Sequence, residues 1–157
     1  MRKGDVICYM SHKRSLRLAF QAHADEDEVQ LQVRRVGGGV GHGLFPISAI
    51  ARGAPITSME QPRAVESEMY ATRMGYPHDS VVWLSRKKAY YDESFQRQPG
   101  YRPMWYRMNH AHASSANVEL AISNDGTPIW LAKRSIDPGQ ELRWDYGDNV
   151  PEDWNRQ

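Results

Sequence analysis

Hydrophobic and polar residues alternate along short stretches of the chain, with the period of two that is typical of half-buried β-strands. In residues 28–36, Val29, Leu31 and Val33 fall on one side of such a strand, and polar residues fall on the other. Residues 80–85, SVVWLS, form a short apolar run that is typical of a buried strand. Both segments are therefore predicted to be strands.

The C-terminal half of the chain predicts further strands. Residues 117–136 hold two strand-like runs on either side of Asn-Asp-Gly at 124–126, which are the residue types of a tight hairpin turn. Residues 137–142, DPGQEL, predict another turn, and residues 141–146, ELRWDY, have the pattern of a strand.

The remaining segments are glycine-rich or irregular. GGGVGHG at 37–43 predicts a turn, and LFPISAIARGAPIT at 44–57 predicts strands separated by a second turn. Residues 63–74 have helical spacing and are followed by Gly75, a residue type that often ends helices. Residues 90–103 predict an ordered connection. The fold class is therefore mostly β with short helices (α+β), without the βαβ rhythm of a dinucleotide-binding fold.

Composition and charge narrow the classes of function. A chain of 157 residues with 40% hydrophobic content suits one domain, residues 1–157. The net charge of +1 does not favour strong non-specific binding to nucleic acid. Because Cys8 is the only cysteine, an internal disulfide and a cysteine-cluster zinc site are excluded. A reducing, intracellular compartment is expected.

The chain predicts neither a signal peptide nor a membrane span. Basic residues interrupt the apolar positions of residues 1–20, unlike the continuous apolar core of a signal peptide. No apolar run approaches membrane-spanning length. We therefore expect no membrane partner.

Three segments carry candidate chemistry. They are GVGHGLFPISAIARGAPI at 39–56, YRMNHAHASSANVEL at 106–120 and LAKRSIDPGQELRWDYGD at 131–148. Taken singly, each has an ordinary explanation: a flexible glycine turn, a loop with satisfied hydrogen bonds, and the end of a buried strand. Their order along the chain points instead to one shared site.

In this order the segments resemble the SET-domain family of protein lysine methyltransferases. The matching residues are Gly41, Gly43, Leu44, Phe45, Ile50, Gly53 and Ile56; Asn109 and His110; and Ile136, Pro138, Gly139, Glu141, Leu142, Asp145, Tyr146 and Gly147. The resemblance covers residues 29–148 and is most specific in the third segment. It leaves an N-terminal extension, 1–28, and a short C-terminal tail, 149–157.

The resemblance implies both a fold and a reaction. The fold is the SET-type β-clip, with several small sheets and a knot-like C-terminal threading, which is rare among folds. The reaction is methyl transfer from S-adenosylmethionine to the side-chain amine of a lysine in a protein or peptide. A histone tail is the expected substrate, which would imply chromatin and the nucleus. No direct nucleic-acid site is expected.

The resemblance also assigns roles to particular residues. Tyr146 would be the catalytic residue, orienting the methyl group and the amine while also touching the donor. The other cofactor-binding residues that it implies are Val40, Gly41, His42, Gly43, Asn109, His110 and Trp154. Trp144 and Tyr106 are expected to line the lysine channel. Trp154 would cover the adenine, although an ordinary anchor for the tail explains it equally well.

The sequence departs from the family pattern after Asn-His. Ala111 and His112 replace a common Ser-Cys pair, and the cysteine-rich zinc element of many relatives is absent. His110 and His112 lie close in sequence, but because no third ligand is evident we expect hydrogen-bonded or solvated histidines and no metal. Two alternatives remain open: a SET-like binding module without turnover, and a small β domain that binds nucleic acid through SRKKAYY at 85–91.

Overall fold

The strands and helices fall into two compact units. The computed structural model describes residues 6–8, 29–39, 41–77, 80–85 and 88–147. Unit 1 comprises Met1–Met59 and Met104–Asp145, and unit 2 comprises Glu60–Pro103 and Tyr146–Gln157. The predicted extension at 1–28 and tail at 149–157 lie outside the described residues, apart from one short strand at 6–8. That residues 1–157 form a single domain stays a prediction.

The first sheet of unit 1 is antiparallel, with the order β1-β2-β3. Its strands are β1 (Val6–Cys8), β2 (Gln30–Val36) and β3 (Gly41–Pro46). The predicted strand at 28–36 is confirmed, and Leu31 on its apolar side is fully buried. Gly38 and Gly39 turn the chain between β2 and β3 with φ of 72° and 78°, a backbone conformation that favours glycine.

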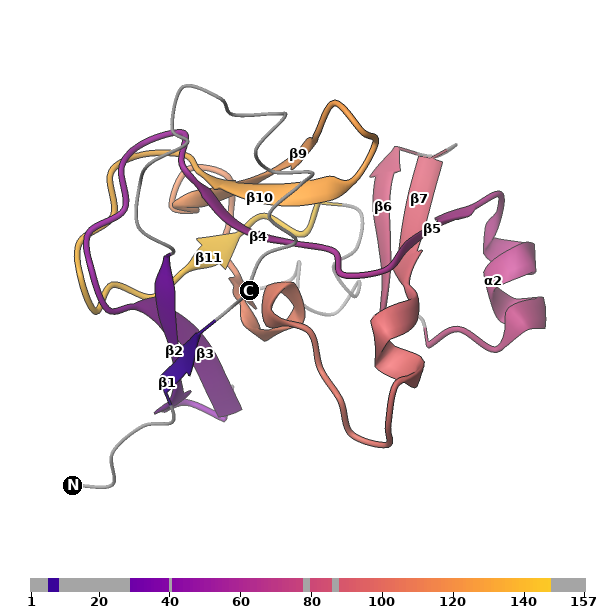
Figure 1. Cartoon of the computed structure of the whole chain (residues 1–157), viewed down its shortest axis with the longest axis horizontal. Helices are drawn as coiled ribbons and strands as arrows, with labels where there is room; N and C mark the ends of the chain where they lie inside the picture. The colour runs from indigo at the N-terminus through magenta and orange to yellow at the C-terminus, as the bar shows by residue number, and fades with distance from the viewer. Residues whose placement is uncertain (1–5, 9–28, 40, 78–79, 86–87, 148–157) are drawn as a thin grey trace. The chain divides into compact units, whose positions relative to one another are not determined.

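The second sheet of unit 1 has five strands in the order β4-β10-β9-β11-β8 (Figure 1). They are β4 (Pro55–Ser58), β8 (Asn109–His110), β9 (Val118–Ile122), β10 (Pro128–Ala132) and β11 (Arg143–Trp144). The antiparallel pair β9–β10 confirms the predicted hairpin, whose turn contains Gly126 at φ 83°. The predicted strand at 141–146 is confirmed but shorter, because only Arg143 and Trp144 pair with neighbouring strands.

The end of unit 1 is threaded through its own sheet. β8 and β9 follow each other in sequence, yet β11 lies between them and runs parallel to both. The connection at 111–117 therefore crosses over β11, and its two ends are bonded to that strand. The Ala111 N–H donates to the Trp144 carbonyl (3.0 Å), and the Asn117 N–H donates to the Arg143 carbonyl (3.1 Å). This is the knot-like arrangement that was predicted.

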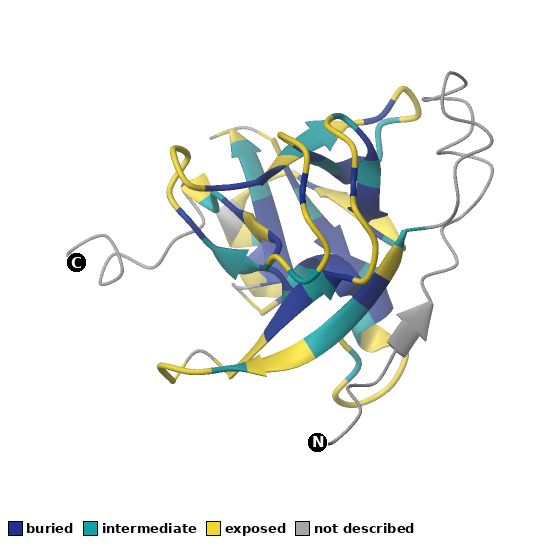
Figure 2. Cartoon of the chain, turned by 90° about the vertical axis from the view of Figure 1, so that its left-hand side faces the viewer, coloured by how far each residue is buried: buried dark blue, intermediate teal, exposed yellow. Residues whose placement is uncertain are grey.

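Three tryptophans form the centre of unit 1. Trp105, in the short helix η4 (Met104–Arg107), stacks on Trp130 with ring centroids 5.0 Å apart. Trp144 packs edge-on against Trp130 at 5.4 Å. All three are at most 5% exposed. Figure 2 shows burial along the whole described chain: buried residues lie mainly in the strands, and most loops are exposed.

Unit 2 contains a three-stranded antiparallel sheet in the order β5-β7-β6 (Figure 1). Its elements are β5 (Pro62–Val65), α2 (Glu68–Met74), β6 (Val81–Ser85), β7 (Lys88–Asp92) and η3 (Glu93–Gln96). The predicted strand at 80–85 is confirmed as β6. In its core, Tyr76 from the segment after α2 stacks on Tyr91 of β7, with centroids 3.8 Å apart.

Two predictions for unit 2 were wrong in their boundaries. The helix predicted at 63–74 begins at Glu68, because the Ser67 side chain caps it by accepting from the Tyr70 N–H, while 62–65 pairs with β7 as a strand. The connection predicted at 90–103 begins with strand residues, since Tyr90, Tyr91 and Asp92 belong to β7. Tyrosine is common in strands as well as in loops, and here pairing with β5 and β6 makes Tyr90 and Tyr91 part of a strand.

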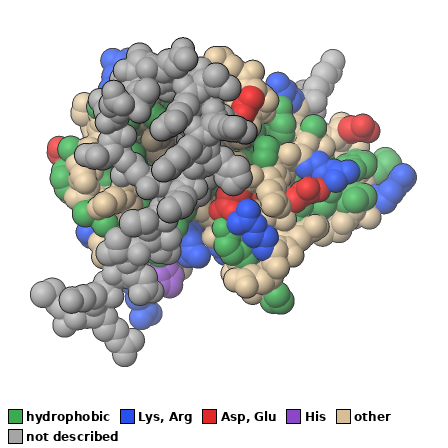
Figure 3. Space-filling view, in the orientation of Figure 1, with side chains coloured by type: hydrophobic (Ala, Val, Ile, Leu, Met, Phe, Trp, Pro, Cys, Tyr) green, Lys and Arg blue, Asp and Glu red, His purple; other side chains and the backbone are tan. Residues whose placement is uncertain are grey.

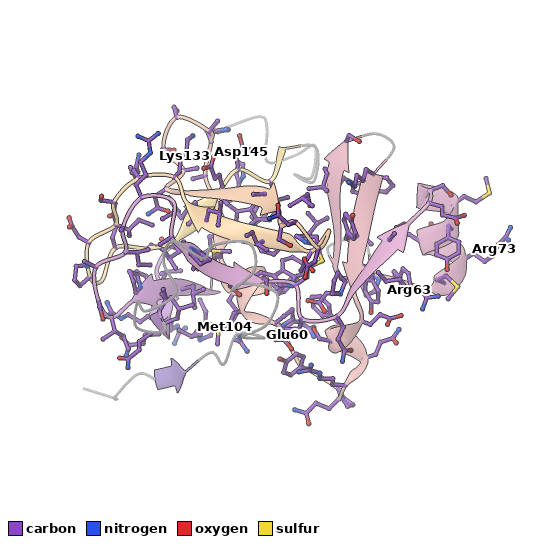
Figure 4. The ribbon with its side chains drawn as sticks, turned by 45° about the horizontal axis from the view of Figure 1, so that its top comes forward. Glu60, Arg63, Arg73, Met104, Lys133 and Asp145 are labelled. Carbon is purple, nitrogen blue, oxygen red and sulfur yellow. The ribbon has the colours of Figure 1, made fainter. Side chains whose placement is uncertain are left out.

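A buried carboxylate ends β7. Asp92 is fully buried, and its two oxygens accept from the N–H groups of Glu60, Gln61 and Ser94 at 3.0 Å each. At the surface of unit 2, Arg97 pairs with Glu60 (2.6 Å) and Arg63 with Glu93 (2.7 Å). Figure 3 accordingly shows acidic and basic side chains next to each other, and Figure 4 shows the positions of Glu60 and Arg63.

Truncating the central tryptophan should strongly destabilise the protein. Trp130→Ala removes a fully buried ring that contacts Trp105 and Trp144, so we expect the free energy of unfolding to fall by about 3–5 kcal/mol. Met69→Ala, at a side chain that is 73% exposed, should change it by less than about 0.5 kcal/mol. Urea denaturation followed by circular dichroism measures both. Equal effects of the two substitutions would contradict the assigned core.

Candidate functional site

The three predicted segments come together at the side chain of Asn109 on β8. Its amide nitrogen Nδ2 donates to Glu141 Oε1 at 2.7 Å and to the backbone carbonyl of His42 at 3.0 Å. His42 belongs to β3, which carries the glycine motif, and Glu141 belongs to the C-terminal motif just before β11. One amide therefore joins parts of the chain that are 67 and 32 residues away from it in sequence.

Gly43 allows β3 to approach the Glu141 carboxylate. A Cβ atom at position 43 would lie 2.6 Å from Glu141 Oε1, which is closer than real Cβ atoms come to other heavy atoms. The other carboxylate oxygen, Oε2, lies 3.3 Å from the Arg143 guanidinium. The carboxylate thus has partners on two sides, and a larger residue at position 43 would displace it from this place.

Asn117 clamps the crossing of the chain. It is 2% exposed, and its Nδ2 donates to the Glu141 carbonyl (2.8 Å) while its Oδ1 accepts from the Arg143 N–H (2.9 Å). Its own carbonyl accepts from the Lys133 N–H (2.9 Å) after β10. A buried side chain therefore adds to the backbone hydrogen bonds at the point where the segment at 111–117 passes over the C-terminal strand.

The loop after His110 is also held by two cations. Lys133 Nζ donates to the Ala113 carbonyl (2.6 Å), and the Arg134 guanidinium donates to the Ser115 carbonyl (3.1 Å). In Figure 4 Lys133 lies on the same side of unit 1 as Asp145, the residue that follows β11. The departure from the family pattern in this loop is thus accommodated by an ordered segment.

His110 is held in a mostly neutral state. Its side chain is 15% exposed, and burial lowers the pKa of the imidazole below its ordinary 6.5. Asp145, 3.9 Å from Nδ1, raises that pKa, whereas His112 and Arg143 lower it further. Burial is the largest of these influences. The imidazole is therefore chiefly uncharged at neutral pH.

The backbone of His110 faces away from β11. β8 is the last strand of its sheet, and the Ala111 N–H is directed at the Trp144 carbonyl on the inner side. Because backbone groups of successive strand residues point to opposite sides, the N–H and carbonyl of His110 point to the outer side.

The glycine motif begins β3 with open space beside Gly41. Gly41 has φ of 88° and pairs with Val36 of β2, and apart from its chain neighbours no described residue lies within 4 Å of the position that a Cβ would take. Val40, the preceding residue of the predicted site, lies outside the described residues. Gly41 and His42 are therefore the described part of the predicted loop.

The two residues predicted for the lysine channel lie in different surroundings. Trp144 is 5% exposed and belongs to the tryptophan cluster. Tyr106 is half-buried on η4, with its ring edge-on to Trp105 at 5.8 Å. Tyr146 is half-buried and follows Asp145 directly, at the start of the second segment of unit 2. The roles of these three residues stay predictions, and Trp154 lies outside the described residues.

Two residues of this arrangement were not predicted to belong to the site. Glu141 was matched to the family motif without a role, and Asn117 was matched to the asparagine that ends the Asn-His motif, two residues later than usual, also without a role. The place of Asn117 directly before the alternating residues of β9, between Ala116 and Val118, also indicated a buried polar residue.

The described residues contain no group of three or more His, Cys, Asp or Glu side chains arranged to hold a metal ion. None of the described helices has the length and the apolar character needed to cross a bilayer.

Solved structures share this architecture. The Chaetomium thermophilum polycomb repressive complex 2 (PRC2) aligns with a TM-score of 0.60 and 20% identity over 86% of this chain. CpSET8 from Cryptosporidium aligns with a TM-score of 0.55 and 18% identity over 92% of it. The chain has the SET-domain fold. A ctPRC2 structure in an autoinhibited conformation, bound to S-adenosylmethionine, also matches, with a TM-score of 0.57 and 19% identity over 80% of this chain.

The SET-domain likeness covers different shares of these proteins. The chain spans 17% of the matched Chaetomium thermophilum chain, 16% of the chain in the autoinhibited complex and 70% of CpSET8. No family model and no curated protein sequence matches the chain. The SET-domain fold thus rests on structural similarity, together with the Asn109 junction described above.

Removing the buried clamp should cost stability. Asn117→Ala leaves the Glu141 carbonyl and the Arg143 N–H without their side-chain partner, so we expect the free energy of unfolding to fall by about 2–4 kcal/mol. Asn124→Ala, at an exposed turn position, serves as the matched control and should change it by less than about 0.5 kcal/mol. Urea denaturation measures both, and a small effect at position 117 would contradict the clamp.

The lowered pKa of His110 predicts a loss of stability in acid. The folded state disfavours the imidazolium, so the unfolded state binds more protons once the pH falls below about 6.5, and stability present above that pH is lost. Unfolding free energies at about pH 8 and about pH 5 should differ more in the wild type than in His110→Gln. The same pH dependence in both proteins would show that His110 does not contribute.

Proposed function

We propose that this SET-domain chain transfers a methyl group from S-adenosylmethionine to the side-chain amine of a lysine in a protein substrate. The observation that carries the proposal is the junction at Asn109, which joins the glycine motif, the Asn-His motif and the C-terminal motif within a SET-type fold. The motif match and the fold likeness favour the same reaction class.

The described residues fit an amino-acid-bearing nucleoside such as this donor. Gly41 leaves open space where a Cβ would lie, and Asn109 retains an amide oxygen that is a hydrogen-bond acceptor. The outward backbone groups of His110 suit the polar edge of an adenine. Gly41, His42, Gly43, Asn109 and His110 would therefore hold the donor, together with Val40 and, over the adenine, Trp154.

Positioning supplies most of the catalysis in such a reaction. When bound, S-adenosylmethionine supplies an electrophilic methyl group on a positively charged sulfur. Methyl transfer to an amine is an in-line displacement, so the protein must hold the lysine nitrogen in line and exclude water. Trp144 and Tyr106 are proposed to line the channel that does so. A buried ring such as that of Trp144 would narrow the channel.

Tyr146 is proposed to be the catalytic residue. Lysine has an ordinary pKa of about 10.4, so a neutral nucleophile requires desolvation and a hydrogen-bond acceptor that orients the amine. A tyrosine hydroxyl can orient the amine without acting as a strong base. The position of Tyr146 in the Asp-Tyr-Gly motif, two residues after β11, supports this role.

The substrate is proposed to be a protein or peptide lysine, with a histone tail as the first candidate. This choice follows the SET-type resemblance, and it would locate the protein in the nucleus, within a reducing intracellular compartment. Mass spectrometry of a histone-derived peptide library after incubation with the donor tests it. If only non-histone peptides were methylated, the proposed reaction would be supported and the histone substrate would be refuted.

A SET-like binding module without turnover is the second candidate. It is favoured by the loop at 111–117, where Ala111 and His112 replace the common Ser-Cys pair and where Lys133 and Arg134 hold the backbone. Calorimetry with S-adenosylmethionine separates the two candidates when it is combined with the peptide library. Donor binding without methylation of any peptide would favour the module, and no donor binding would contradict both.

Replacing the proposed catalytic phenol should slow turnover while sparing donor binding. We expect Tyr146→Phe to lower kcat by about 100-fold or more and to leave the donor Kd nearly unchanged, because the hydroxyl acts on the amine in the transition state. Tyr70→Phe, at a partly buried tyrosine beside the core of unit 2, is the matched control and should retain kcat. Peptide methylation by mass spectrometry and donor calorimetry provide the two readouts. An unchanged kcat in Tyr146→Phe would refute the assignment.

A further inference from the structure

The Glu141 carboxylate meets three parts of unit 1 at once. Oε1 accepts from Asn109 Nδ2 at 2.7 Å, Oε2 lies 3.3 Å from Arg143 Nε, and the carboxylate abuts the main chain at Gly43. The side chain is 20% exposed, so its contacts are partly shielded from water. Its backbone carbonyl is separately fixed by Asn117. Both the position and the direction of the carboxylate are therefore determined.

A carboxylate imposes one orientation on the amide that faces it. The two ends of an asparagine amide have nearly the same shape, so packing alone does not choose between them. An ionised carboxylate only accepts hydrogen bonds, and the backbone carbonyl of His42 likewise only accepts. Both of these neighbours therefore require Nδ2, and Oδ1 is left for other partners.

We propose that Glu141 is a positioning residue, which fixes the amide of Asn109 so that its Oδ1 is presented to the ligand as a hydrogen-bond acceptor. The complementary ligand group is a positively charged hydrogen-bond donor such as an ammonium. This inference rests on the proposed function, because the ammonium is that of the amino-acid part of the methyl donor. Glu141 itself acts only through Asn109.

The two contacts of the Glu141 carboxylate, with Arg143 and with Asn109, differ in what they contribute. The Arg143 side chain is 45% exposed, and an ion pair with so exposed a partner contributes little. The bond to Asn109 is charge-assisted and shorter, and it is the one that determines which amide atom faces outward. Loss of the Glu141 carboxylate should therefore be felt chiefly at Asn109.

The orientation can be tested without any ligand. In ¹⁵N-labelled protein, the side-chain amide resonances of Asn109 are identified by their loss in Asn109→Ala. We expect Glu141→Ala to shift them strongly, Glu141→Gln to shift them less because its Oε1 can still accept, and Arg143→Gln to leave them nearly in place. Asn109 resonances that do not respond to Glu141→Ala would overturn the proposal. This outcome does not depend on whether the protein is a methyltransferase.

A double-mutant cycle on the donor Kd tests the consequence. With S-adenosylmethionine in calorimetry, Glu141→Ala should weaken binding about tenfold, Glu141→Gln by a smaller factor, and Arg143→Gln by less than about threefold. In the Asn109→Ala background, Glu141→Ala should have no further effect. Additive losses would show that Glu141 acts independently of Asn109 and would overturn the proposal. Absence of binding in the wild type would instead refute the proposed function, and the resonance test would still decide the orientation.

Discussion

The structure of unit 1 depends on satisfying the backbone where the C-terminal strand passes between β8 and β9. β11 offers only two residues for pairing, so strand ladders alone cannot bond the crossing segment. The buried side chain of Asn117 provides the missing donor and acceptor, and it reaches Glu141 and Arg143 on either side of Leu142. Because an unpaired buried amide is costly, this one asparagine keeps the threaded segment in register.

The same crossing brings the candidate site together. Glu141 is fixed through its carbonyl by Asn117 and through its carboxylate by Asn109, so the clamp and the site share one residue. Asn109 in turn bonds the β3 backbone at His42, where the missing side chain of Gly43 leaves room for the carboxylate. Structural polar groups and the groups offered to a ligand are thus successive members of one network.

Local signals were sufficient for part of this architecture. The hairpin β9–β10 was predictable because alternation and an Asn-Asp-Gly turn are both encoded within 20 adjacent residues. The start of α2 was predicted too early because helical spacing extends back to residue 63, whereas the Ser67 side chain caps the helix and makes it begin at Glu68. β8 and β11 are two residues each, and their extent is set by pairing with strands far away in sequence, so the local pattern indicated a strand at 141–146 but not its bounds, and gave no sign of β8. For the site, the motif resemblance supplied Asn109 and Glu141, but their hydrogen bond follows from the threading alone.

A shared fold at 18–20% identity does not by itself carry a reaction, because one fold supports many functions. What distinguishes this site is its distribution of charge. The carboxylate of Glu141 lies behind Asn109, whereas burial keeps His110 uncharged beside it. A positively charged ligand would meet an acceptor backed by a negative charge on one side and a neutral imidazole on the other. The Arg143 guanidinium, 3.3 Å from Glu141 Oε2, offsets part of that negative charge, and because its side chain is 45% exposed the offset is weakened by water.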